Sequence, residues 1–146
     1  MQKITTFLTF NNQAETAATF YTSVFADSKI NRITRSGEAV ISATFQLRGQ
    51  AFFALNGGPH FSFSDGISLF VDCENQQEVD ELWENLSAGG EKDQCGWLKD
   101  KFGVSWQIVP SALGRLLQNE DPQKAKRVMA AMMQMTKIDI QALEVA

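Results

Sequence analysis

The chain has 146 residues, 44% of them hydrophobic and 21% charged, a composition typical of one globular domain with a sizeable core. Its formal net charge is −4 and it carries no block of lysines or arginines, which argues against nucleic acid as a partner. No apolar run approaches the roughly 20 residues that a membrane helix needs, and two cysteines without a signal-peptide pattern predict a cytoplasmic protein with reduced thiols.

The first part of the chain predicts the element order β-α-β-β-β. Residues 4–10 alternate as a strand, and Asn12 and Glu15 have the spacing of a capping box at the start of a helix that runs to about Phe25. Turn residues then separate three further strands, which are predicted at 29–35, 39–47 and 51–55.

The segment 56–65 is rich in Gly, Pro and Ser and predicts a linker, after which the same element order returns. A strand at 67–73 leads to a helix that begins near Asn75, where Glu78 completes a second capping box. This helix carries an apolar stripe formed by Val79, Leu82, Trp83 and Leu86. A strand beginning at 91–94 and a hairpin over 97–109 complete the second set. The repeat indicates an internal duplication with modules at about 1–56 and 66–110.

The predicted hairpin places a polar amide on an otherwise apolar strand. Gln107 shares one strand face with Ser105 and Val109, and this arrangement suits a hydrogen-bonding group inside a cup. Lys99 and Asp100 flank the turn and are expected to form a solvated surface pair. The alternative is that the Asp100 carboxylate caps the turn.

The segment 111–146 changes character and predicts helices. A short helix is expected at 111–117, a second begins at Asp121-Pro122, and a last helical turn falls at 139–143. The second helix carries an apolar stripe that is expected to cover a core face, a sheet or a partner subunit, formed by Ala125, Val128, Met129, Met132 and Met135.

These features resemble the vicinal oxygen chelate superfamily, which includes glyoxalase, bleomycin-resistance and extradiol dioxygenase proteins. The resemblance rests on the two β-α-β-β-β units, an Ala-Thr-Phe-Tyr-Thr-Ser-Val-Phe helix at 18–25 and a closing Asp-x-Phe-Gly-x-x-Trp-x-Ile strand at 100–108. More narrowly, the segments 53–59, 67–71, 95–100 and 122–129 resemble the PhnB-like branch, often labelled demethylubiquinone methyltransferase. The chain has no Gly-rich loop of the kind that opens a nucleotide-binding β-α unit.

The resemblance implies an α+β fold in which two tandem βαβββ modules form a curved mixed sheet, with additional C-terminal helices. It also implies a homodimer. In metal-dependent members of the superfamily, His or Glu on the first and last strands of each module hold a divalent ion. Aligned through the strand ends, those four positions fall on Thr5, Ala54, Gly66 and Gln107. None is a good metal ligand, and a shift by one residue does not restore a site, so no metal and no cofactor are expected.

The leading hypothesis is a metal-free protein that binds an apolar or aromatic small molecule. Seven residues are expected to contact the ligand, four through apolar surface and three through hydrogen bonds: Phe7, Phe53, Trp97 and Val109, then Thr5, Ser68 and Gln107. One alternative is a metal-dependent lyase or dioxygenase-type enzyme that uses other residues. A second is an interaction module whose cup is filled by its own side chains. The sequence leaves open whether the protein is an enzyme.

Overall fold

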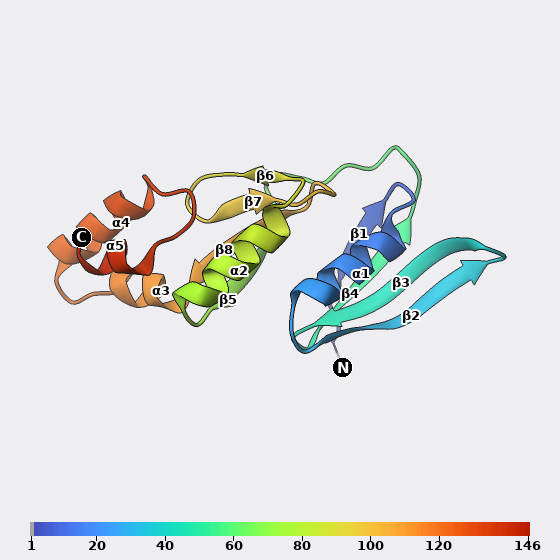
Figure 1. Ribbon diagram of the computed structural model, residues 1–146, viewed down its shortest axis with the longest axis horizontal. Coiled ribbons are helices and arrows are strands. Elements are labelled where there is room, and N and C mark those ends of the chain that lie inside the picture. The colour runs from blue at the N-terminus through green and yellow to red at the C-terminus, as the bar shows by residue number, and fades with distance from the viewer. Residues whose placement is uncertain (1) are drawn as a thin grey trace. The chain divides into compact units, whose positions relative to one another are not determined.

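In the computed structural model, which describes residues 2–146, the chain divides into two compact units, Met1–Ser62 and Phe63–Ala146 (Figure 1). The division falls inside the linker predicted at 56–65. Each unit contains one four-stranded mixed sheet and a helix that packs against it, which confirms the α+β class and the repeated βαβββ order. That both modules form a single domain stays a prediction.

Unit 1 (Met1–Ser62) contains four strands and one helix. Its sheet has the order β1-β4-β3-β2, with β1 and β4 parallel and the other neighbours antiparallel. The elements are β1 Thr6–Phe10, α1 Ala14–Val24, β2 Ser28–Ser36, β3 Ala39–Leu47 and β4 Gln50–Asn56.

Unit 2 (Phe63–Ala146) repeats this arrangement with the order β5-β8-β7-β6, in which β5 and β8 are the parallel pair. The matching strand orders confirm the duplication. The elements are β5 Leu69–Cys73, α2 Gln76–Ser87, β6 Glu91–Lys92, β7 Trp97–Lys99, β8 Ser105–Pro110, α3 Ser111–Leu117, α4 Pro122–Met132 and α5 Ile140–Glu144.

The start of α1 differs from the predicted capping box. Asn12 has a left-handed backbone with φ 62°, and the N-cap is Gln13, whose side chain accepts no hydrogen bond from the helix. Instead, the backbone N–H of Ala14 donates to Oδ1 of Asn56 over 2.9 Å. Asn56 also donates from Nδ2 to the carbonyl of Val40 over 3.0 Å. The cap therefore comes from the end of β4, 42 residues away.

The core of unit 1 lies between α1 and its sheet. The rings of Tyr21 and Phe45 are 6.0 Å apart, and those of Phe45 and Phe52 are 5.3 Å apart and nearly parallel. The buried side chains of α1 are Ala14, Ala17, Ala18 and Tyr21. The opposite face of this sheet has no helix of unit 1 over it.

The second helix begins as predicted. Oδ1 of Asn75 accepts a hydrogen bond from the backbone N–H of Glu78 over 2.9 Å. Its stripe is buried against the sheet at all four predicted positions, Val79, Leu82, Trp83 and Leu86.

Asp100 is not the solvated surface residue that was expected, because its side chain is only 3% exposed. Oδ1 accepts hydrogen bonds from the backbone N–H groups of Phe102 (2.9 Å) and Val104 (3.1 Å). Oδ2 accepts one from Nε1 of Trp106 over 2.9 Å. The alternative interpretation, a carboxylate that caps the turn, is confirmed, and Lys99 pairs with Asp65 instead, over 2.7 Å.

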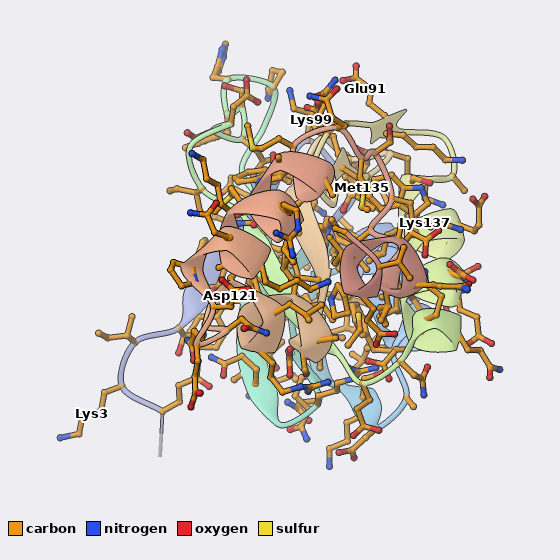
Figure 2. All side chains as sticks on the ribbon, turned by 90° about the vertical axis from the view of Figure 1, so that its left-hand side faces the viewer. Lys3, Glu91, Lys99, Asp121, Met135 and Lys137 are labelled. Carbon is orange, nitrogen blue, oxygen red and sulfur yellow. The ribbon has the colours of Figure 1, made fainter. Side chains whose placement is uncertain are left out.

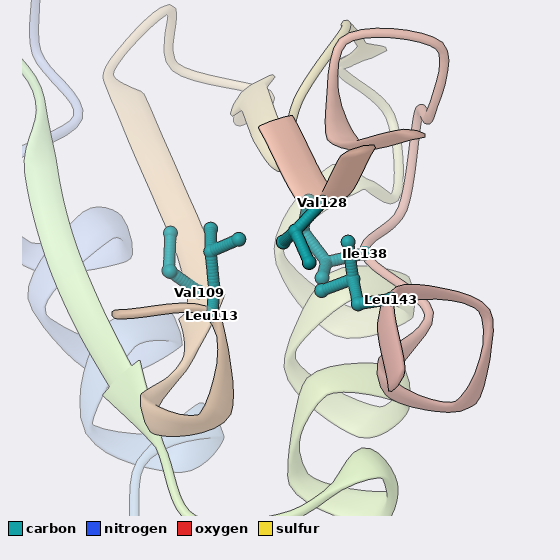
Figure 3. Packing of buried hydrophobic residues seen from close by; sticks show 5 residues of the cluster. All are labelled: Val109, Leu113, Val128, Ile138 and Leu143. Atoms are coloured by element: carbon teal, nitrogen blue, oxygen red, sulfur yellow. The ribbon is translucent and has the colours of Figure 1, made fainter. Parts of the chain in front are cut away.

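The C-terminal helices build a small core of their own against the end of β8. Figure 3 shows its five most buried members, Val109, Leu113, Val128, Ile138 and Leu143. Asp121 lies at the start of α4 (Figure 2), where Oδ1 accepts from the backbone N–H of Gln123, as the sequence predicted. The predicted stripe of α4 is only partly buried: Val128 is fully covered, whereas Met129 is 44% exposed.

Polar contacts from α2 hold the C-terminal segment in place. Nε2 of Gln76 donates to the carbonyl of Ile138 over 2.9 Å, and Oε1 of Gln76 accepts from the N–H of Ile140 over 2.8 Å. Nζ of Lys137 lies 2.9 Å from Oδ1 of Asp80 (Lys137 is labelled in Figure 2). The hydrogen bond from Gln76 and then the contact with Lys137 lower the pKa of Asp80 below its usual 3.8.

This lowered pKa gives an expected pH dependence. A carboxylate whose pKa falls on folding stabilises the folded state above its unfolded pKa, and that contribution is lost as the pH falls through the folded pKa. Asp80→Asn should therefore cost at most about 1 kcal/mol at pH 7, because the pair is partly exposed, and less at pH 2–3. Urea unfolding of both proteins at the two pH values measures this. An equal cost at both pH values would contradict this explanation. Lys137→Met should remove only part of the difference between the two pH values, because the hydrogen bond from Gln76 lowers the pKa of Asp80 more.

Within residues 2–146, no helix is both long enough and apolar enough to cross a membrane.

Candidate functional site

The sheet of unit 2 has one face covered by α2 and one face that α2 leaves open. Side chains alternate along a strand, so the residues between the buried ones point to the second face. We call this second face of unit 2 the open face. Its members follow from the register of β5, β8 and β7: Ser68, Phe70, Asp72, Ser105, Gln107, Val109, Trp97 and Lys99.

One row of the open face combines two aromatic rings with an amide. Phe70 pairs with Gln107 across the parallel strands, and Gln107 pairs with Trp97 across the antiparallel strands. Nε2 of Gln107 donates to Oγ of Ser68 over 2.9 Å. The structure thus brings together three of the predicted site residues, Ser68, Trp97 and Gln107.

Phe70 is a member of this row that the sequence analysis did not name as a site residue. Its side chain is 60% exposed, while Val71 beside it is buried. Two sequence signals could have identified it. Phe70 alternates along the strand with apolar residues that face α2. It also follows Phe7 by 63 residues, which is the separation between the two predicted capping residues, Asn12 and Asn75.

The corresponding face of unit 1 carries two more predicted residues. Phe7 on β1 and Phe53 on β4 pair in register, and their rings meet edge to face with centroids 6.0 Å apart. They are 55% and 40% exposed. Thr5 precedes β1 and accepts a hydrogen bond at Oγ1 from Nε2 of Gln2 over 3.3 Å.

Val109 lies on the open face but is covered. It is 8% exposed because the C-terminal helices pack over it together with Leu113 and Val128 (Figure 3). Val109 is therefore part of a hydrophobic core, and a ligand on the open face does not reach it in this conformation.

The four positions tested for metal binding need one correction. The register pairs Phe7 with Phe53 and Phe70 with Gln107, so the counterpart of Gln107 in unit 1 is Phe53, whereas Ala54 is 1% exposed and faces α1. The alignment through strand ends placed this position one residue too late on β4. A shift of one residue moves a side chain to the opposite face of the strand. Phe53 has no donor atom, so the corrected set fits a divalent ion no better.

Other residues do not supply a metal site. Among residues 2–146, no group of three or more His, Cys, Asp or Glu side chains lies in a position to hold an ion. Thr5 and Gln107 offer only neutral oxygens, and Gly66 has no side chain. The donor chemistry of the chain therefore does not fit the ion of the metal-dependent relatives.

Two hollows lie away from these faces. A groove of about 800 Å³ in unit 2 runs between the start of α2 and the C-terminal helices, with Arg115, Lys137 and Glu144 in its lining. One of about 440 Å³ in unit 1 is lined by Glu15, Arg35 and others. Neither lining includes a predicted site residue.

Comparison with known proteins gives one family. The family model described as 3-demethylubiquinone-9 3-methyltransferase matches residues 2–109. A solved PhnB protein from Bacillus cereus, whose description carries the same enzyme name, is 40% identical with a TM-score of 0.71. The similarity covers 75% of this chain and 100% of that one. The family match ends at Val109, so α3, α4 and α5 lie outside it.

More distant structures share the fold. A glyoxylase/bleomycin resistance protein/dioxygenase domain from Frankia is 15% identical, with a TM-score of 0.50 over 75% of this chain and 92% of that one. The fosfomycin resistance protein FosX from Listeria monocytogenes, solved with Mn(II) and sulfate, is 16% identical, with a TM-score of 0.52 over 73% and 90%. No curated protein matches the chain.

Proposed function

The chain belongs to the 3-demethylubiquinone-9 3-methyltransferase family, the PhnB-like branch of the vicinal oxygen chelate superfamily, and from this membership we propose that it binds a small molecule without a metal ion. The family name describes a methyltransferase, and methyl transfer is not part of the proposal. The proposed ligand is apolar or aromatic and lies against the open face of unit 2.

The observation that carries the proposal is the row formed by Phe70, Gln107 and Trp97. Two aromatic side chains flank one amide, and the hydrogen bond to Ser68 fixes the direction of that amide. A mostly apolar surface with a small number of oriented polar groups is typical of a small-molecule site. Phe70 is 60% exposed, so the protein's own side chains leave room over the row.

Each unit carries predicted contact residues on its own sheet. In unit 2, Trp97 supplies apolar surface while Ser68 and Gln107 supply hydrogen bonds. In unit 1, Phe7 and Phe53 present apolar surface, and Thr5 offers a hydroxyl for a hydrogen bond. Val109 is left out because it is buried. A homodimer, which the family resemblance implies, stays a prediction.

The metal-free part of the proposal is supported by the donor set. FosX was solved with Mn(II), but the positions of this chain that correspond to the metal ligands of the superfamily offer neutral oxygens or no donor at all. Imidazole and carboxylate groups bind such ions much better.

Metal analysis of the purified protein tests this point. After dialysis without chelator, we expect less than about 0.1 transition-metal ion per chain, because no side-chain set holds one tightly. Elemental analysis by plasma mass spectrometry measures the content. About one tightly held ion per chain would contradict the proposal and favour the metal-dependent enzyme.

A further inference from the structure

Resting on the proposed function, we propose that the ligand is a flat aromatic molecule with an N–H or O–H at its edge. Its ring lies between Phe70 and Trp97, and its N–H or O–H donates to Oε1 of Gln107. This goes beyond an apolar ligand because it specifies a ring and a donor.

The spacing of the row suits one ring. Phe70 and Trp97 lie on β5 and β7, on either side of β8. Two strand spacings separate their backbones by about 9.5 Å. A ring held between two aromatic faces at van der Waals contact needs about 7 Å between them. The two side chains can therefore lean toward a single flat ring above Gln107.

The amide selects a donor. One of the two N–H groups on Nε2 of Gln107 donates to Oγ of Ser68 over 2.9 Å. No N–H or O–H of residues 2–146 donates to Oε1, so this oxygen is an acceptor that a ligand over the row would cover. Covering an acceptor without supplying a donor costs more than the hydrogen bond itself returns. A ligand with an N–H or O–H at this point is therefore preferred over the same ring without one.

Unit 1 lacks the feature that gives this selectivity. Phe53 takes the place there that Gln107 takes in unit 2, and its ring contacts Phe7 edge to face. Donor selectivity should therefore depend on Gln107 alone.

Three probes and four variants test the inference. The probes are indole, 1-methylindole, which lacks the N–H, and cyclohexanol, which has a donor but no aromatic ring. Titration of the ¹⁵N-labelled protein, followed at the side-chain amide of Gln107 and the indole N–H of Trp97, gives the affinities. We expect indole to bind about 5–10-fold more tightly than 1-methylindole, and cyclohexanol more weakly than both.

The variants separate the roles of the residues. Gln107→Leu should bring the ratio of the two indole affinities to about 1, read from the Trp97 signal. Gln107→Glu keeps an acceptor and should retain a preference for indole. Phe70→Leu should weaken both indoles by a similar factor of about 3–10. Gln123→Leu, on exposed α4, is the matched control and should change nothing. Spectra of each free variant establish that it is folded.

The outcomes distinguish this inference from the proposed function. Equal binding of indole and 1-methylindole by the natural sequence would overturn the inference and leave small-molecule binding intact. Tight binding of cyclohexanol would do the same. Absence of any shift on the open face with all three probes would overturn both.

Discussion

Replacing Asp100 with alanine is expected to lower the free energy of unfolding of unit 2 by about 3–5 kcal/mol. The carboxylate is 3% exposed and accepts hydrogen bonds from Phe102, Val104 and Trp106. Alanine leaves all three donors without this acceptor at a buried position, where each unpaired group costs about 1–3 kcal/mol. Relaxation of the turn and the entry of water reduce the total cost.

The measurement is urea unfolding followed by tryptophan emission. All three tryptophans, at positions 83, 97 and 106, lie in unit 2, so emission reports on that unit. Asp93→Ala is the control, because Asp93 is exposed in the nearby loop between β6 and β7, and its cost should stay within about 0.5 kcal/mol. A cost below about 1 kcal/mol for Asp100→Ala would show that the buried carboxylate does not organise the turn.

The second large effect is expected from Gly90→Ala, at about 3 kcal/mol or more. A β-carbon at Gly90 would overlap the carbonyl oxygen of Lys99 and lie 2.7 Å from the carbonyl carbon of Asp100. Both are backbone atoms, and the turn that holds them is fixed by the Asp100 hydrogen bonds. The added methyl group therefore forces the backbone apart, and overpacking at a rigid site costs more than at a flexible side chain.

Gly114→Ala on α3 is the control for this substitution. No atom lies within 4 Å of a β-carbon there, and alanine favours the helix by about 1 kcal/mol over glycine. Thermal unfolding should thus give opposite signs for the two glycines. If Gly90→Ala were as stable as the natural protein, Gly90 would not lie as close to the backbone of Lys99 and Asp100 as the structure places it.

The sequence predicted the elements well where local physics decides them. The cap at Asn75, the buried stripe of α2 and the hairpin at 97–109 all follow from spacing along a few residues. The start of α1 shows the limit of that reasoning. Its local motif was complete, yet the cap comes from Asn56, which only the folded sheet brings to the helix.

The site was harder to predict because it depends on register and coverage. Asp100 and Val109 look like surface and pocket residues in sequence, but tertiary contacts bury both. Ala54 was assigned to the wrong face, since strand ends are poor markers of phase. Phe70 was missed because its neighbours Gln107 and Trp97 come from β8 and β7, and only the strand register brings the three residues together.

Everything proposed here depends on a vacant, metal-free surface beside Gln107. A crystal structure of the protein grown with indole tests that surface most directly. We expect electron density for one ring between Phe70 and Trp97, with its nitrogen on the Gln107 side, and no anomalous signal from a bound ion. An ion ligated by side chains of the open face, or the chain's own side chains packed over the row, would contradict the account.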